Sequence, residues 1–332
     1  MPDEREELMA IMSLTVEMRT AVVGCLVAAL ATASVPARAA DIEIMAPAAP
    51  GGGYDRTARA FEQALEQEKL GSATVVNVGG AGGAIGLAQF IRNRAGSDSA
   101  MIVGGFGMVA SFATNRSKVT LADVTPVARL ISEYSVVVVP KDSPVKSLAD
   151  LTAKLKQNPG AVSWAGGSAG GTDHILAGSI AKAVGVDPKQ VNYVAFSGGG
   201  DALAAIVGGQ VTAGLGGFSE LAEQIKAGTV RPLAISAAAR VPGVDIPTLK
   251  EQGVDATLSN WRGIAAPPGL APAQRQAYLD LTDKVVKSKT WKDILKTNGW
   301  NDEYLAGDAF KTYIETETTR VTEILTQLGL VK

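Results

Sequence analysis

The chain has 332 residues, of which 46% are hydrophobic and 19% are charged. This length and apolar content suffice for two lobes with cores of their own and exclude a disordered chain. The first forty residues hold three of the 31 basic and five of the 33 acidic residues, which leaves 28 of each sign. A nucleic-acid-binding protein would show a basic excess, so we expect no nucleic-acid partner.

The N-terminus has the pattern of a secretory signal peptide. Arg19 precedes an apolar run over residues 21–35, which is too short and too rich in small residues for a membrane span. The triplet Ala37-Arg38-Ala39 fits an A-x-A cleavage site. We therefore expect residues 1–39 to be a signal peptide that is removed after Ala39, and the rest of the chain to reach the periplasm.

Two features of this segment leave alternatives open. Acidic residues before Met18 make a poor start for a signal peptide, so translation from Met12 or Met18 is an alternative. Cys25 follows Val22-Val23-Gly24, a weak lipobox, which favours secretion over a lipid anchor. After cleavage the chain has no cysteine, so it has no disulfide, thiolate metal site or cysteine nucleophile.

The first lobe is expected to alternate strands and helices. Ala58, Phe61 and Leu65 share one face of a helix that Gly71 closes. We expect strands at residues 41–46, 74–78, 101–103 and 136–139, and helices at residues 54–70 and 84–92.

A second lobe follows a turn and a new helix start. Ser147-Leu148-Ala149-Asp150 fits a capping box, in which the serine side chain and the acid satisfy backbone N–H groups at a helix start. We expect strands at residues 162–165, 191–196, 211–215 and 230–236, with helices beginning near Thr172, Asp201 and Ser219.

The C-terminal part is expected to return to the first lobe. Residues 261–268 read as a strand that leads into a helix at Pro272, and two amphipathic helices follow. The apolar stripe of the last helix is typical of a core face. Its members are Phe310, Tyr313, Ile314, Val321, Ile324, Leu325 and Leu328. This organisation gives lobe I as residues 40–138 plus 258–332 and lobe II as residues 139–257.

Glycine clusters stand between apolar runs and helices in both lobes. Four such runs end at residues 50–53, 79–83, 166–167 and 197–200. Glycine lets the backbone approach a ligand closely, and a helix N-terminus offers unpaired N–H groups to an anion. A single cluster could be only a tight turn, but four of them favour a cleft that holds an anion with the main chain.

Enzymatic and metal-binding alternatives fit the sequence less well. Residues 166–170 match G-x-S-x-G, but the one histidine, His174, lies six positions beyond Ser168 and cannot take its place in a hydrolase triad. Gly80, Gly82 and Gly86 exceed the dinucleotide-binding spacing by one residue. One histidine and no mature cysteine also disfavour zinc. We therefore expect no catalytic residue, metal or cofactor.

Three residues near helix starts have two interpretations. His174 either bonds neighbouring backbone in a first helical turn or contacts a ligand. Asp55 and Asp201 either cap helices or contact a ligand, because acids near helix N-termini commonly serve as caps. The sequence leaves these alternatives open.

Several motifs together resemble those of the solute receptors of tripartite tricarboxylate transporters, also called Bug proteins. They are APAAPGGGYD at residues 46–55, NVGGAGGAIG at 77–86, SGGGDAL at 197–203, GGQV at 208–211 and IKAG at 225–228. GFSEL at 217–221, NWRG at 260–263 and APPG at 266–269 resemble the branch named for tricarboxylate or citrate binding. The pattern departs at Tyr54, where Thr or Ser is frequent, and at Asp173, where an added acid disfavours a trianion.

The resemblance implies an α/β fold of the type II periplasmic-binding-protein class, with two lobes and a ligand cleft between them. It implies a monomeric, non-enzymatic receptor that captures a carboxylate, such as citrate or a di- or aromatic carboxylate, and delivers it by transient contact to the large and small subunits of a membrane permease. The alternatives are a ligand-sensing subunit of a signalling system and, more remotely, a serine hydrolase that uses Ser168.

The expected binding site is made of main-chain N–H groups from both lobes. Such charge-assisted bonds contribute about 1.5 to 3 kcal/mol each, so a handful suffices for micromolar binding without a buried arginine. The candidate residues are Gly52, Gly53, Tyr54, Asp55, Gly82, Gly83 and Ala84 of lobe I, and Ser168, Ala169, Gly170, Gly171, Thr172, Ser197, Gly198, Gly217, Phe218 and Ser219 of lobe II.

Overall fold

A mixed sheet organises the residues that the computed structural model describes, which are 40–197 and 199–331. The predicted signal peptide and its cleavage site lie outside them. The strands are β1 (Ala40–Ala46), β2 (Gly71–Asn77), β3 (Ala100–Gly105), β4 (Thr125–Pro140), β5 (Ser163–Gly166), β6 (Asn192–Ala195), β7 (Ala213–Gly217), β8 (Val230–Ile235), β9 (Ser259–Ala266) and β10 (Asn301–Ala306).

Helices follow most of these strands. They are α2 (Gly53–Gln67), α3 (Ala84–Arg94), α4 (Phe106–Asn115), α5 (Leu148–Gln157), α6 (Thr172–Ala183), α7 (Gly199–Val207), α8 (Phe218–Lys226), α9 (Pro272–Lys287), α10 (Lys289–Asn298) and α11 (Gly307–Gln327). Short 3₁₀ turns are η2 (Ala81–Gly83), η3 (Leu121–Asp123), η4 (Pro159–Ala161), η5 (Pro188–Gln190) and η6 (Lys250–Gln252). None of the helices in the described part combines the length and apolar character needed to span a bilayer.

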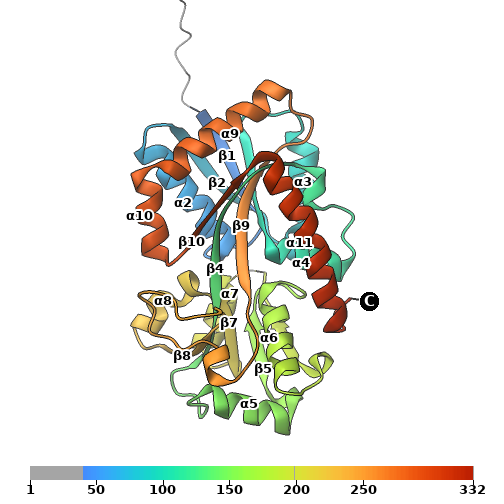
Figure 1. Cartoon of the computed structure of the whole chain (residues 1–332), viewed down its shortest axis with the longest axis vertical. Coiled ribbons are helices and arrows are strands. Elements are labelled where there is room, and N and C mark those ends of the chain that lie inside the picture. Colours follow the sequence, from blue (N-terminus) through green and yellow to red (C-terminus); the bar gives the residue numbers. More distant parts are fainter. Residues whose placement is uncertain (1–39, 198, 332) are drawn as a thin grey trace, which may run out of the picture. The chain divides into compact units, whose positions relative to one another are not determined.

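The long strand β4 connects two groups of parallel strands. Its first part pairs antiparallel with β9 and β10, and from Ser135 onward it pairs with β7 and β8. In one group β1 pairs parallel with β2 and β3, and in the other β5 pairs parallel with β6 and β7. Figure 1 shows β4 and β9 running lengthwise between the two groups. The fold is thus α/β with two lobes.

The middle of β4 is buried on both faces, which explains its unbroken apolar sequence. Because strand side chains alternate between faces, Val137 and Val139 join one core cluster while Val136 and Val138 join another. All four side chains are fully buried. Such a run reads locally as a short buried strand, and this is why only residues 136–139 are recognisable from the pattern.

Most predicted elements are confirmed, with ends that shift by a few residues. The exception is β4, which begins at Thr125 although only residues 136–139 were predicted. The capping box at the start of α5 is present, since Ser147 Oγ accepts from Asp150 N and Asp150 accepts from Ser147 N. The prediction lacked β10, whose sequence NDEYLA has no apolar alternation, and α4, whose start is masked by Gly105 and Gly107. Neither element has a local sequence pattern that predicts it, because both are stabilised by tertiary contacts.

The C-terminal helices return to the first group of strands. Trp291 of α10 is fully buried and meets Phe61 of α2 edge-on, with 6.3 Å between the ring centroids. The predicted stripe of α11 is buried at Phe310 and Val321. The far end of α11 reaches α6, where Lys182 Nζ donates to Gln327 Oε1 at 3.4 Å.

Candidate functional site

A cavity of about 100 Å³ lies where strands of both groups end. Its wall includes Pro47 and Ala48 after β1, Gly167 after β5, and Gly217 at the end of β7. Ligands of open α/β sheets bind at such carboxyl ends. The complete lining is Pro47, Ala48, Gly52, Gly53, Tyr54, Gly82, Gly107, Ser111, Gly167, Ser168, Gly171, Thr172, Asp173, Ser197, Gly199, Gly217, Glu220, Asn260 and Arg262.

The cavity brings together about half of the predicted site residues. Those in its lining are Gly52, Gly53, Tyr54, Gly82, Ser168, Gly171, Thr172, Ser197 and Gly217. Those outside the lining are Asp55, Gly83, Ala84, Ala169, Gly170, Phe218 and Ser219. Gly198 lies outside the described residues. The turns from both lobes therefore face one shared space, although whether they bind a ligand stays a prediction.

Asp55 supports the turn that carries Gly52 and Gly53. It accepts from Gly51 N at 2.9 Å, from Asn77 Nδ2 at 3.0 Å and from Arg59 Nε at 3.0 Å. Burial opposes its ionisation, but these hydrogen bonds outweigh burial and hold the pKa of Asp55 below its ordinary value. In this structure Asp55 stabilises the loop before α2.

Tyr54 links α2 to α4 beside the cavity. Its hydroxyl accepts from Met108 N, in the first turn of α4, at 2.9 Å. Burial raises the pKa of Tyr54 to about 12, so the hydroxyl keeps its proton and can donate it to an acceptor in the cavity.

Within the described residues, four helices that border the cavity have a glycine N-cap, which contributes no side-chain cap. Their N-cap residues are Gly52 for α2, Gly105 for α4, Gly171 for α6 and Gly217 for α8. The Tyr54 hydroxyl accepts from Met108 N in the first turn of α4, and Glu133 accepts from Ser219 N in the first turn of α8 at 3.3 Å. Within residues 40–197 and 199–331, no side chain accepts from the first-turn N–H groups of α2 and α6. These two helices therefore present N–H groups and positive dipole ends from opposite lobes.

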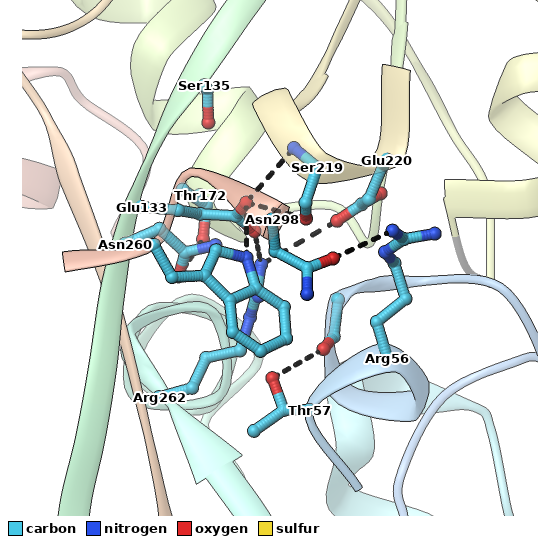
Figure 2. Close-up of polar contacts among 12 residues, drawn as sticks. Arg56, Thr57, Glu133, Ser135, Thr172, Ser219, Glu220, Asn260, Arg262 and Asn298 are labelled. Carbon is cyan, nitrogen blue, oxygen red and sulfur yellow. Dashed lines mark hydrogen bonds and ion pairs between the residues drawn. The ribbon is translucent and has the colours of Figure 1, made fainter. Parts of the chain in front are cut away.

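A buried ion pair lies beside these helix ends. Arg262 of β9 and Glu133 of β4 are 1% and 0% exposed, and Arg262 Nη2 donates to Glu133 Oε1. Figure 2 shows both side chains pointing toward Ser219 and Glu220 at the start of α8. Glu133 Oε2 also accepts from Ser219 Oγ at 2.8 Å and from Trp300 Nε1 at 3.2 Å. The carboxylate of Glu133 is thereby satisfied as an anion.

Two further acids face the same cavity. Glu220 Oε1 lies 3.7 Å from Arg262 Nη2, and Asp173 Oδ2 accepts from Gly167 N at 2.9 Å. Burial, together with the charge of Glu133, raises the pKa of Glu220 to about 8. Burial also raises the pKa of Asp173. Glu220 therefore favours its protonated form at neutral pH in the folded protein.

Close packing on this cluster explains several glycines of the predicted anion-binding turns. A Cβ would overlap the Arg262 guanidinium at Gly53, the Glu220 carboxyl at Gly199 and the Glu133 carboxyl at Gly217. Gly170 has φ +75° and a Cβ there would overlap Thr114 of α4. These positions exclude side chains for steric reasons, independently of any ligand.

His174 bonds to neighbouring backbone, which is the first of its two interpretations. Its Nδ1 accepts from Gly170 N at 3.0 Å, and its ring stacks on Tyr193 at 4.4 Å between centroids. Burial lowers the pKa of His174. The histidine thus holds the turn that contains Ser168.

No sequence motif indicated that Glu133, Glu220, Arg262 and Ser111 belong to the site. A buried arginine, Arg262, lines the cavity, where main-chain donors alone were expected to suffice. The available signal was a charge inside an apolar strand pattern, at Glu133 and at Arg262, because such a charge must be paired when the strand is buried. The partner is 129 residues away, so no local spacing identifies it.

Fold and cavity together define a type II periplasmic binding protein. A sequence model described as the tripartite tricarboxylate transporter family receptor matches residues 57–330. The chain therefore belongs to the tripartite tricarboxylate transporter receptor family, a family of periplasmic solute-binding receptors, as its motifs predicted.

Two relatives show how far the similarity extends. BugT of Bordetella pertussis is 27% identical over 304 residues, which cover 89% of this chain and 90% of BugT. A protein encoded in the TAR-I ttuE-ttuC' intergenic region of Agrobacterium vitis is 29% identical over 231 residues. That alignment covers 68% of this chain and 65% of the relative.

Two solved structures from Rhodopseudomonas palustris share the fold. One, with adipate, has a TM-score of 0.79 and 24% identity, and covers 89% of this chain and 99% of its own. The other, MatC with bound malate, has a TM-score of 0.77 and 23% identity, and covers 87% of this chain and 99% of its own. At these identities the likeness shows the fold alone.

The buried pair makes a strong prediction for stability. Replacing Arg262 with methionine leaves Glu133 buried and unpaired, so the free energy of unfolding should fall by about 3–5 kcal/mol in urea denaturation. The added change Glu133→Gln removes the unpaired charge and should restore part of this loss. In the exposed pair of Arg240 with Glu251, Arg240→Met should cost less than about 1 kcal/mol. Equal losses of stability in Arg262→Met and Arg240→Met would contradict the conclusion that the buried pair matters more to stability than the exposed pair.

Because the pKa of Glu220 is raised in the folded protein, we expect the free energy of unfolding to depend on pH. The unfolded chain releases this proton near pH 4.5, but the folded protein keeps it up to about pH 8, so Glu220 lowers the stability progressively between these values. Glu220→Gln should remove this effect. Urea unfolding at pH 5 and pH 8 should show the variant gaining stability relative to wild type at pH 8. Glu223→Gln, at an exposed position of α8, should follow wild type, and a Glu220→Gln difference that is constant with pH would refute the prediction.

Proposed function

We propose that the protein captures a small carboxylate in this cavity and delivers it to a tripartite tricarboxylate transporter permease. The observation that carries the proposal is the pair of helix starts, α2 at Gly52 and α6 at Gly171, which border the cavity and have no side-chain cap among the described residues. Unpaired N–H groups and positive dipole ends favour an anionic group. The adipate and malate named with two structures of this fold belong to that chemical class.

Side chains of the cavity complete the proposed carboxylate site. Ser111 of α4 is 1% exposed, lines the cavity, and its Oγ makes no hydrogen bond within residues 40–197 and 199–331. Tyr54 and Thr172 add hydroxyl groups to the same wall. A carboxylate would accept from several of these donors together with the N–H groups. The residues outside the lining, including Asp55 and Ser219, then support the site without contact to the ligand.

We also propose that the protein acts as a receptor without catalysis. Ser168 lines the cavity, but Nδ1 of His174 is occupied by Gly170 N, and its lowered pKa makes it a weak general base. A serine nucleophile needs such a base within hydrogen-bond reach. The geometry therefore favours binding and release of an unchanged ligand.

Ser111 provides the test of the carboxylate site. A thermal-shift screen of citrate, malate, adipate, aromatic acids and amino acids should identify at least one binder, and calorimetry gives its affinity. Ser111→Ala should weaken that binding by about 10-fold because one donor is lost. Its free energy of unfolding should stay unchanged, since Ser111 Oγ has no partner to lose.

Thr282 offers a matched control. Its Oγ1 is likewise buried and without a partner among the described residues, but it lies on α9 and does not line the cavity. Thr282→Val should leave both affinity and stability close to wild type. Absence of any binder in the screen, or unchanged affinity in Ser111→Ala, would refute the proposed site.

We further propose that the chain is exported and cleaved after Ala39. The first described strand supports this, because β1 pairs with β2 from Ala40 onward and a chain that begins at Ala40 keeps the whole strand. Intact-mass measurement of the protein from the periplasmic fraction should give Ala40 as the first residue. A mature form that retains Cys25 with an attached lipid would overturn the proposal.

A further inference from the structure

The carboxyl of Glu220 lies beside a contact between the two lobes. In the loop after β1, Ala49 N donates to Ser197 O, in the loop after β6 of the other lobe, at 3.5 Å. A Cβ placed on Gly199 would lie 3.4 Å from Gly52 Cα and would also overlap the Glu220 carboxyl. The Glu220 side chain is 14% exposed. Main-chain contacts between the lobes therefore help to shield this carboxyl from water.

These contacts are of a kind that can separate. β4 and the start of β9 carry the chain from one lobe to the other (Figure 1). At the contact itself, a Cβ on Gly51 would lie 4.0 Å from Gly200 Cα, so main chain meets main chain with little apolar surface buried. Lobes joined by connecting strands open and close by hinge rotation. Opening at this point would admit water to Glu220.

The charged groups around Glu220 leave one acid in excess. Glu133 of β4 and Asp173 of α6 face it, together with two cations, Arg262 of β9 and Arg56 of α2. Figure 2 shows Glu220 on α8 and Arg56 on α2, which belong to different lobes. Three acids thus share two guanidinium groups. A buried charge without a partner is costly, so the closed cluster is favoured when one acid holds a proton.

Hydrogen bonds indicate that Glu220 is the acid that holds this proton. Glu133 and Asp173 both accept hydrogen bonds, which favour their ionised forms. Within the described part of the chain, Glu220 accepts no hydrogen bond, and its carboxyl lies 3.7 Å from Arg262. Tyr54 of α2 also faces Glu220, but it keeps its own proton and adds no charge. Burial and the charge of Glu133 accordingly raise the pKa of Glu220 to about 8.

We propose that closure of the two lobes takes up one proton from solvent at Glu220, and that opening releases it. The proposal goes beyond the carboxylate-binding function, because it concerns the motion of the lobes with or without a ligand. In the open form water reaches the carboxyl, and its pKa returns toward the ordinary value. Because the closed form holds the proton more tightly, lowering the pH through about 8 stabilises the closed form.

Energy transfer between two fluorescent labels measures closure directly. Cys25, the one cysteine of the chain, is replaced by serine, and Ala88→Cys of α3 and Ala204→Cys of α7 provide exposed labelling positions on the two lobes. Without ligand, the closing equilibrium constant should rise about 10-fold between pH 9 and pH 7. This range stays above the pKa of His174, which burial lowers.

Variants assign the pH dependence to one acid. Glu220→Gln is neutral at every pH, so its closed fraction should stay at least as high as that of wild type at pH 7. Asp173→Asn should keep the pH dependence and move it to lower pH, because the charge of Asp173 raises the pKa of Glu220. Glu223→Gln, one turn along α8 and exposed, should follow wild type. Urea unfolding at pH 7 checks that each variant is folded.

The outcomes separate this inference from the proposed function. A wild-type closed fraction that stays constant between pH 9 and pH 7 would refute the inference, as would an equal pH dependence in Glu220→Gln. If Asp173→Asn abolishes the dependence, Asp173 holds the proton and the assignment to Glu220 is wrong. The carboxylate screen judges the proposed function by itself, since the closure measurement needs no ligand.

Discussion

The ion pair between Arg262 and Glu133 is the constraint on which the cavity depends. It joins β9 to β4 just before Ser135, where β4 changes from one group of strands to the other. Charges buried this deeply need hydrogen-bond partners, and the start of α8 with Trp300 supplies them for Glu133. Arg262 Nη1 is buried and has no partner among the described residues. The helices of both lobes are positioned around this pair.

The pair of Arg262 and Glu133 gives a second explanation for the glycines of the predicted turns. The sequence suggested that glycine brings the main chain close to an anionic ligand, and the structure shows that Gly53 and Gly217 bring it close to a guanidinium and a carboxylate of the protein itself. Both interpretations place a charged group next to the main chain. The difference matters because a side chain at these positions would disturb the fold as well as any bound molecule.

The fold was largely predictable because its signals are local. Apolar runs that end in glycine mark strand-to-helix turns, and Ser147 with Asp150 marks a helix start within four residues. The charged part of the site was unpredictable for the opposite reason. Arg262, Glu133 and Glu220 belong to three different elements, and only tertiary structure brings them together. Likewise β10 exists because β4 offers an open edge for its polar sequence.

The unbroken course of β4 also limits how the chain can change during evolution or engineering. Inserting or deleting one residue there would turn every following side chain to the opposite face and exchange the two valine pairs between their cores. The exposed stretch around Gly243, between β8 and η6, has no such register to preserve. Length variation, including a grafted reporter domain, is best accommodated there.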